Sequence, residues 1–251
     1  MPESNLHAFS RTEMLIGTEN IHRLHKSCIL VFGAGGVGSF CIEALARSGV
    51  GTLILVDNDV VSLTNINRQS IAFLSTIGRY KTELLKERIG DIHPDCRVIT
   101  RETFVLPENL ENLMEDLIRD AKKVPDYIID AIDTVAAKLA LAEYAHAHHI
   151  PLLSSMGTGN KLHPELFTID DIFSTSVCPL CRVMRRELKK RQIPSLKVLY
   201  SREIPSTPQV LEDAQKEAAG RRSLPGSISF VPPAAGLMIA GEVIRRICEI
   251  S

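Results

Sequence analysis

The stretch Val31-Phe-Gly-Ala-Gly-Gly-Val-Gly-Ser39 decides the fold of this chain. It continues an apolar run that begins at Cys28, which is typical of a central parallel strand covered on both faces. Gly33, Gly35 and Gly38 match the pattern G-x-G-x-x-G. Such glycines allow a tight turn and let the backbone approach phosphate groups at the N-terminus of a helix. The stretch therefore predicts a nucleotide site between a strand and a helix.

The second apolar run, Thr52 to Asp57, ends on an acid that can accept hydrogen bonds from ribose hydroxyls. Further runs predict strands at 96–100, 127–133, 150–155, 166–172 and 197–201, the fourth of these being an edge strand. Segments between them predict helices at about 39–48, 80–92, 108–122, 179–192 and 232–248. A further helix follows the strand at 127–133 and ends at 148. A capping box at Ser10 to Glu13 predicts another helix start.

Strands that alternate with helices indicate βαβ units and a parallel sheet. We expect an α/β, Rossmann-like fold with a mostly parallel sheet, helices on both faces and an elaborated C-terminal third. A single adenylation-type domain over residues 1–251 would hold its nucleotide core at about 26–155 and its substrate-facing part at about 156–251.

Composition limits the function classes. The net charge is −1, so any attraction to nucleic acid must come from a local patch. Six cysteines in 251 residues favour reduced thiols in the cytosol over a disulfide scaffold. The first residues lack the pattern of a signal peptide, and no apolar run approaches the about 20 residues of a membrane span. We expect a soluble, cytoplasmic protein without a membrane partner.

The block Thr64-Asn-Ile-Asn-Arg-Gln69 is unusual for a site that would hold NAD or FAD. Arg68, together with Lys81 at the start of the next helix, would bring two positive charges to the nucleotide. Such charges suit a triphosphate and a departing pyrophosphate better than hydride transfer. Taken singly, either residue is more often a surface charge. The pattern G-x-x-x-x-G-K-[ST] is absent, so this would not be a P-loop.

The blocks GAGGVGS, RSGVGTLILVDNDVVSLTNINRQ and DAID, with Lys81, resemble the ATP-dependent adenylyltransferase family that includes ubiquitin-activating enzymes and activators of sulfur-carrier proteins. The resemblance runs from Lys26 to about Ser155. It implies ATP and Mg²⁺ as cofactors and attack of a carboxylate on the α-phosphorus, which yields an acyl-adenylate and pyrophosphate.

The resemblance also implies a role for individual residues. Arg11 would reach the ATP site of the other subunit in a homodimer, and Asp133 would hold magnesium. The catalytic set is Arg11, Arg68, Lys81 and Asp133. The ATP-binding set consists of Gly33, Gly35, Gly36 and Gly38 in the glycine turn, Asp57 and Asp59 on the ribose side, and Asn65, Arg68 and Lys81 on the phosphates.

The segments DAIDTVAAKLAL, SSMGTGNKLHP and RRELKKR resemble one branch of this family, the tRNA threonylcarbamoyladenosine dehydratases. That resemblance implies ATP-dependent dehydration of threonylcarbamoyladenosine in tRNA, by ring closure of an adenylated carboxylate. The alternative is activation of the C-terminus of a ubiquitin-like or sulfur-carrier protein. A nucleotide-binding regulatory protein without turnover is a third possibility. Whether a cysteine desulfurase or another sulfur-transfer protein is a partner stays open.

Five cations of the predicted helix 179–192 fall at spacings that place them on one helical face. A stripe of this kind can follow tRNA phosphates without reading bases, although a solvated helix face explains the charges equally well. The stripe consists of Arg182, Arg185, Arg186, Lys189 and Lys190. Arg221 and Arg222 could extend it.

Cys178 and Cys181 form the only C-x-x-C pair, whereas activators of sulfur-carrier proteins usually have two such pairs around zinc. Two thiolates do not complete a closed zinc site, so we expect no zinc within the monomer. The run His146 to His149 ends a helix, where histidines favour the negative end of the dipole. We expect no metal there.

Overall fold

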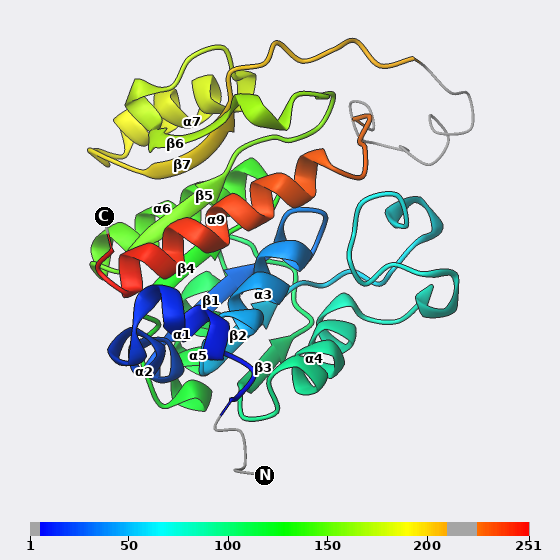
Figure 1. Cartoon of the computed structure of the whole chain (residues 1–251). Helices are drawn as coiled ribbons and strands as arrows, with labels where there is room; N and C mark the ends of the chain where they lie inside the picture. The colour runs from blue at the N-terminus through cyan, green and yellow to red at the C-terminus, as the bar shows by residue number, and fades with distance from the viewer. Residues whose placement is uncertain (1–5, 210–224, 251) are drawn as a thin grey trace.

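The computed structural model of the chain describes residues 6–209 and 225–250 and contains one seven-stranded sheet (Figure 1). The strand order is β3-β2-β1-β4-β5-β7-β6, and every neighbouring pair is parallel except β6 with β7. The strands are β1 Cys28–Phe32, β2 Thr52–Val56, β3 Arg97–Arg101, β4 Tyr127–Asp130, β5 Leu152–Ser155, β6 Phe167–Asp171 and β7 Lys197–Ser201. The predicted α/β, mostly parallel fold and the predicted edge strand are confirmed.

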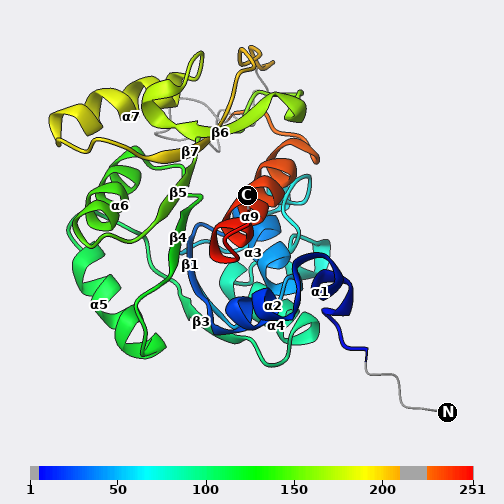
Figure 2. The same ribbon diagram turned by 60° about the vertical axis from the view of Figure 1, so that its left-hand side comes forward.

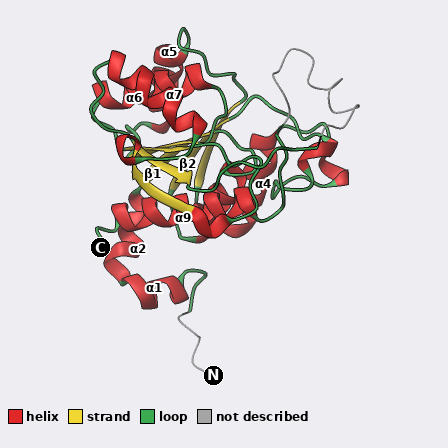
Figure 3. Cartoon of the chain, turned by 90° about the horizontal axis from the view of Figure 1, so that it is seen from above, coloured by secondary structure: helices red, strands yellow, loops and turns green. Residues whose placement is uncertain are grey.

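Helices cover both faces of the sheet, as Figures 2 and 3 show. Side chains of α5, α6 and α7 share one core with Leu30 and Phe32 of β1. Side chains of α3, α4 and α9 share the other core with Ile29 and Val31. The helices are α1 Ser10–Ile16, α2 Thr18–Lys26, α3 Gly38–Arg47, α4 Lys81–Ile92, α5 Leu110–Ala121, α6 Val135–Ala147, α7 Pro179–Lys190 and α9 Val231–Ile247. Short 3-10 turns occupy η1 Leu63–Asn65, η2 Leu74–Thr76, η3 Pro164–Leu166 and η4 Ile172–Ser174. β1 is buried throughout because it lies between these two cores.

The C-terminal helix α9 closes the fold against α3. A Cβ on Gly236 would lie 2.3 Å from the carbonyl oxygen of Val37, so the two helix backbones approach closely only because this residue is glycine. The first turn of α9 carries Pro232 and Pro233, where a missing N–H costs no helical hydrogen bond. This packing brings residues of the last fifth of the chain beside the turn that follows β1.

Two local predictions were wrong. The helix start predicted at Ser10 is confirmed, but the capping box itself does not form, because Ser10 is the first residue of α1 and Phe9 occupies the capping position. Phe9 is buried against the rings of His25 and His93, at centroid distances of 5.5 and 4.8 Å, and this packing draws Ser10 into the first helical turn. The predicted strand 127–133 ends at Asp130, since the Asp130 carboxylate accepts a hydrogen bond from the Ile132 N–H and turns the chain.

Two further observations bear on the sequence predictions. Arg221 and Arg222 lie outside the described residues. Within the described parts of the chain, no helix combines the length and the apolar character that crossing a membrane requires.

Candidate active site

The glycine turn lies between the end of β1 and the start of α3. Gly33 has a φ of 91°, and a Cβ there would lie 2.6 Å from the carbonyl oxygen of Ala131. A Cβ on Gly38 would lie 1.8 Å from the carbonyl oxygen of Gly33. Because a side chain fits at neither position, the first turn of α3 comes directly against the end of β1. N–H groups at a helix N-terminus favour an anion, so the turn offers a phosphate site.

Gly35 and Gly36 form the face of the turn that meets the block Thr64–Gln69. A Cβ on Gly36 would lie 3.3 Å from Cγ of Arg68, and one on Gly35 would lie 4.0 Å from Nε2 of Gln69. Arg68 is half-buried, donates from Nη1 to the carbonyl oxygen of Thr64 at 2.8 Å, and has its pKa lowered by burial. The fold thus brings a guanidinium from the polar block onto the glycine turn.

Two amides of the same block are buried. Asn65 accepts a hydrogen bond on Oδ1 from the Ser62 N–H at 3.1 Å, so that oxygen holds the η1 turn. Oε1 of Gln69 is buried and has no hydrogen-bond partner among residues 6–209 and 225–250. Sequence reasoning gave Gln69 no role, although its place in the block was a signal. An unsatisfied buried amide beside Gly35 suggests a polar ligand.

Asp57, directly after β2, ties together the loops around the turn. Its Oδ2 accepts from the Ala34 N–H at 2.6 Å and its Oδ1 accepts from the Asp59 N–H at 2.8 Å. Burial raises the pKa of Asp57, while the charge of Lys81 and the two N–H groups act in the opposite direction. Each carboxylate oxygen keeps a second lone pair that a ribose hydroxyl can use.

Lys81 begins α4 and points back to the loop after β2. Its Nζ lies 2.7 Å from Oδ2 of Asp59, and the lysine side chain is 5% exposed against 60% for the aspartate. The pair is anchored by a backbone bond from the Lys81 N–H to the carbonyl oxygen of Asp59. The ammonium is therefore fixed in position, while its partner carboxylate faces solvent. A ligand at Asp59 would meet a positive charge already in place.

Asp133 lies in the loop between β4 and α6. Because β4 pairs with β1 and β1 with β2, the residues that follow these three strands meet at one edge of the sheet. Asp133 is exposed, and among the described residues its Oδ1 accepts only a long hydrogen bond, 3.4 Å, from the Thr134 hydroxyl. A carboxylate with free oxygens at this edge has the donor chemistry that Mg²⁺ prefers.

A buried ion pair between Lys138 and Asp130, which sequence reasoning missed, supports the loop that carries Asp133. Nζ of Lys138 lies 3.0 Å from Oδ2 of Asp130, and both side chains are fully buried. The lysine also donates to the carbonyl oxygen of Ser155 at 2.7 Å, and the Ser154 hydroxyl donates to Oδ2 of Asp130 at 2.5 Å. The pair links the ends of β4 and β5 to α6. The Asp130 carboxylate also holds the turn that leads to Asp133.

Arg11 does not reach the site of its own chain. The glycine turn meets the first turn of α9, where Pro232 lies against Gly36. The helix next to α1 meets the other end of α9, where Arg23 pairs with Glu249 at 2.8 Å. The 17 residues of α9 separate these two places by roughly 25 Å. Figure 1 shows α1 and α2 beside the C-terminal end of α9. Arg11 is exposed there.

The cations of α7 have different surroundings. The buried side of the helix carries Cys181, Met184 and Leu188. Arg185 has a structural role, since its Nη1 donates to the carbonyl oxygen of Thr175 at 3.0 Å and so supports the backbone before α7. Arg182, Arg186, Lys189 and Lys190 are exposed.

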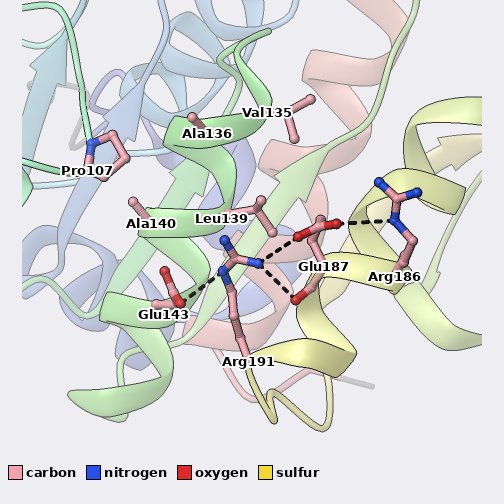
Figure 4. A pocket seen from close by; sticks show the side chains of 9 residues that line it. All are labelled: Pro107, Val135, Ala136, Leu139, Ala140, Glu143, Arg186, Glu187 and Arg191. Carbon is pink, nitrogen blue, oxygen red and sulfur yellow. Dashed lines mark hydrogen bonds and ion pairs between the residues drawn. The ribbon is translucent and has the colours of Figure 1, made fainter.

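A cavity of about 440 Å³ separates α6 from α7 (Figure 4). Its wall carries Glu187, which accepts from Arg186 at 3.1 Å and from Arg191 at 3.0 Å. Arg191 also pairs with Glu143 of α6 at 3.0 Å. These cations hold the pKa of Glu187 at about 2, with Lys190 the largest contributor, followed by Arg191 and Arg186. The wall is therefore balanced in charge, and the excess positive charge lies on the outer face of α7.

Comparisons with known proteins found a matching family, similar sequences and similar solved structures. The ThiF family model matches residues 9–251. The chain is 42% identical over 252 residues to the tRNA threonylcarbamoyladenosine dehydratase of Bacillus subtilis (strain 168), which covers 97% of this chain and 96% of that protein. The solved structure of the E. coli tRNA N6-threonylcarbamoyladenosine dehydratase in complex with ATP matches with a TM-score of 0.82 and 30% identity, over 96% of this chain and 94% of that one. The Sulfur carrier protein ThiS adenylyltransferase of Escherichia coli (strain K12) is 28% identical over 166 residues, 64% of this chain and 63% of that protein.

The buried pair below the Asp133 loop yields a stability prediction. Replacing Lys138 by methionine leaves the Asp130 carboxylate buried without its counter-charge, which we expect to lower the free energy of unfolding by about 3–5 kcal/mol. The double variant Lys138→Met, Asp130→Asn removes both charges and should recover much of that loss. Urea denaturation of the two variants measures both values.

The matched control is Lys86→Met on the exposed side of α4, which should leave the denaturation midpoint nearly unchanged. Equal stability of Lys138→Met and the parent protein would show that the pair does not hold the ends of β4 and β5 together.

Proposed function

The chain belongs to the ThiF family, and from this membership we propose that it is an ATP-dependent tRNA threonylcarbamoyladenosine dehydratase. The observation that carries the proposal is the similarity to the Bacillus subtilis enzyme of that name over nearly the full length of both chains. The continuous sheet supports one adenylation domain over residues 1–251. A substrate in tRNA implies a cytoplasmic location.

The residues around the glycine turn fit ATP. The N-terminus of α3 would receive the phosphates, and the half-buried guanidinium of Arg68 and the ammonium of Lys81 would hold them from the other side. Asp57 and Asp59 would meet the ribose. The buried Gln69 amide, which lacks a partner among the described residues, would gain one from the nucleotide. The ATP-bound E. coli relative supports the same ligand.

The proposed chemistry begins with the free carboxylate of the threonylcarbamoyl group. One of its oxygens attacks the α-phosphorus, the bond to the β-phosphate breaks, and pyrophosphate leaves. Arg68 and Lys81 stabilise the charge that develops on the departing phosphates. Attack by the group's own nitrogen or oxygen on the activated carbonyl then expels AMP and closes a ring. The net change is loss of one water from the modified nucleoside.

Asp133 would hold Mg²⁺, for which its exposed, nearly unbonded carboxylate is suited. The ion would supply positive charge at the phosphates. Arg11 would act on the site of a second copy in a homodimer, because within its own chain it lies at the opposite end of α9. The exposed cations of α7 would follow the phosphates of the tRNA.

The direct test supplies the protein with ATP, Mg²⁺ and tRNA that carries threonylcarbamoyladenosine. We expect AMP and pyrophosphate to form, and the modified nucleoside to lose the mass of one water in mass spectrometry. Unmodified tRNA is the control and should release no AMP. If AMP forms only with a ubiquitin-like or sulfur-carrier protein, the chain is an activator of such proteins instead.

The homodimer role of Arg11 has its own test. Arg11→Ala and Asp133→Ala should each abolish adenylate formation, measured as ATP–pyrophosphate exchange. When the two variants are mixed, one site in each mixed dimer combines an intact Asp133 with the partner's intact arginine, so part of the activity should return. Asp170→Ala, at an exposed carboxylate of the edge strand β6, is the control and should keep full activity. Subunit exchange without any return of activity would contradict the role.

The tRNA-binding role of α7 is tested by replacing Arg182, Arg186 and Lys190 with glutamine. We leave Arg185 unchanged because it supports the backbone at Thr175. If each cation contacts a phosphate, the slope of log affinity against log salt should fall by about 0.7–0.9 per residue lost. ATP binding should not change.

The matched control replaces three exposed lysines away from α7, Lys26, Lys86 and Lys122, with glutamine. It changes the net charge by the same amount as the α7 triple variant. It should keep the parent salt slope. If both triple variants lost the same amount of tRNA affinity and of salt slope, net charge, and not α7, would determine tRNA affinity.

A further inference from the structure

The start of α7 carries two cysteines that are three residues apart. Cys178 is the residue before the helix and Cys181 lies in its first turn. Both side chains are buried, with residue exposures of 3% and 0%. Neither takes part in the nucleotide site described above. No disulfide joins them in this structure.

The backbone before Cys178 is strained. Val177 has a φ of 61°, a left-handed conformation that is unfavourable for a β-branched residue. The N–H of Cys178 donates to the carbonyl oxygen of Ser176 at 2.6 Å, which closes a γ-turn of the rare positive-φ kind around Val177. Strain of this type persists where the surrounding structure requires it, and it often marks functional sites. Here it places the Cys178 thiol at the N-terminus of α7.

A lysine from the loop after β5 acts on the same thiol. Lys161 is 4% exposed and makes no hydrogen bond or ion pair with any other residue in the described ranges. Its charge acts on Cys178. The other buried lysines, Lys81 and Lys138, each have a carboxylate partner. A thiolate at Cys178 would supply a counter-charge for the Lys161 ammonium.

Cys178 is electrostatically unlike the other cysteines. The hydrogen bond from the Cys181 thiol lowers the pKa of Cys178 most, the N–H groups of Cys181 and Leu180 and the charge of Lys161 lower it further, and burial opposes them. Burial instead raises the pKa of the four remaining thiols, to about 11 at Cys28 and about 12 at Cys96, and also at Cys41 and Cys248. A thiolate is the reactive form of cysteine, so one thiol of six is set apart.

We propose that Cys178 and Cys181 form a redox-active dithiol, which a small hydroperoxide oxidises to a disulfide and a thiol reductant restores. The Cys178 thiolate attacks one peroxide oxygen, the O–O bond breaks, and the leaving hydroxide takes a proton to become water. This leaves a sulfenic acid on Cys178. The Cys181 thiol then attacks that sulfur, the S–O bond breaks, and hydroxide leaves with the thiol proton as water. The two thiols lose two electrons, and the peroxide gains them.

The test treats the reduced, full-length protein with hydrogen peroxide at a low molar ratio. Hydrogen peroxide is chosen because thiols this buried exclude bulky reagents. We expect four of the six thiols to remain titratable, an intact mass lower by two hydrogens, and a cross-linked peptide that contains Cys178 and Cys181. Dithiothreitol should restore all six thiols. This peptide map needs no variant, so it stands even if a substitution impairs folding.

Variants assign the roles of the two thiols. Cys181→Ser should form no disulfide and should accumulate a sulfenic acid on Cys178, seen as a gain of one oxygen in the mass of the peptide that contains Cys178. Cys178→Ser should keep its remaining thiols at the same peroxide dose, and Lys161→Gln should form the disulfide several-fold more slowly. Cys96→Ser, a change at the least buried of the other cysteines, is the control and should react as the parent does.

Three results would overturn the proposal. The first is a parent protein that keeps all six thiols under conditions that oxidise a peroxide-sensitive dithiol standard. The second is a cross-linked peptide that joins other cysteines. The third is a Cys178→Ser variant that loses thiols as fast as the parent.

Discussion

A backbone contact too close for any side chain sets the position of every other part of the nucleotide site. At Gly33 and Gly38 the chain leaves β1, passes the carbonyl oxygen of Ala131 and enters α3 with no room for a Cβ atom. That contact brings the end of β1, the end of β4 and the N-terminus of α3 together. The loops that carry Asp57 and Asp133 then meet at the same sheet edge, because their strands flank β1.

The cations near this edge divide into those that hold the structure and those that can act on a ligand. Lys138 is fully buried with Asp130 and binds two strand ends together. Lys81 is also buried, but its partner Asp59 is exposed, so its charge can reach a ligand. Arg68 bonds only to a backbone and an amide oxygen in the described chain, which leaves its charge without a carboxylate. Two of the three therefore carry charge that phosphates could balance.

The C-terminal third adds to the core without forming a separate layer. β7 extends the parallel sheet beyond β5, β6 closes the edge in the antiparallel direction, and α7 covers the same face as α6. α9 crosses back to the opposite face and lies against α3 through Gly236. As a result, the proposed tRNA-facing helix and the dithiol in its first turn are fixed relative to the nucleotide site by continuous strand pairing.

Patterns within a few residues determined much of this protein. Wholly apolar runs predicted the buried strands, the glycine spacing predicted the turn after β1, and Asp57 was correctly placed directly after β2. The predicted helices start and end within a few residues of the observed ones, although α2 was not predicted and the capping box at Ser10 does not form. The last three residues assigned to the strand at 127–133 lie outside β4.

Only the tertiary structure decided which polar groups are paired. Lys138 follows the general pattern of a surface cation, yet it meets Ser155, 17 residues away, in the core. Arg185 belongs to a regular basic stripe, but its guanidinium supports Thr175. The charge of Lys161 acts on Cys178, 17 residues further along the chain, only in the folded protein. Local sequence patterns report neighbours within about one helical turn, whereas the partner of a buried charge is set by how distant segments pack.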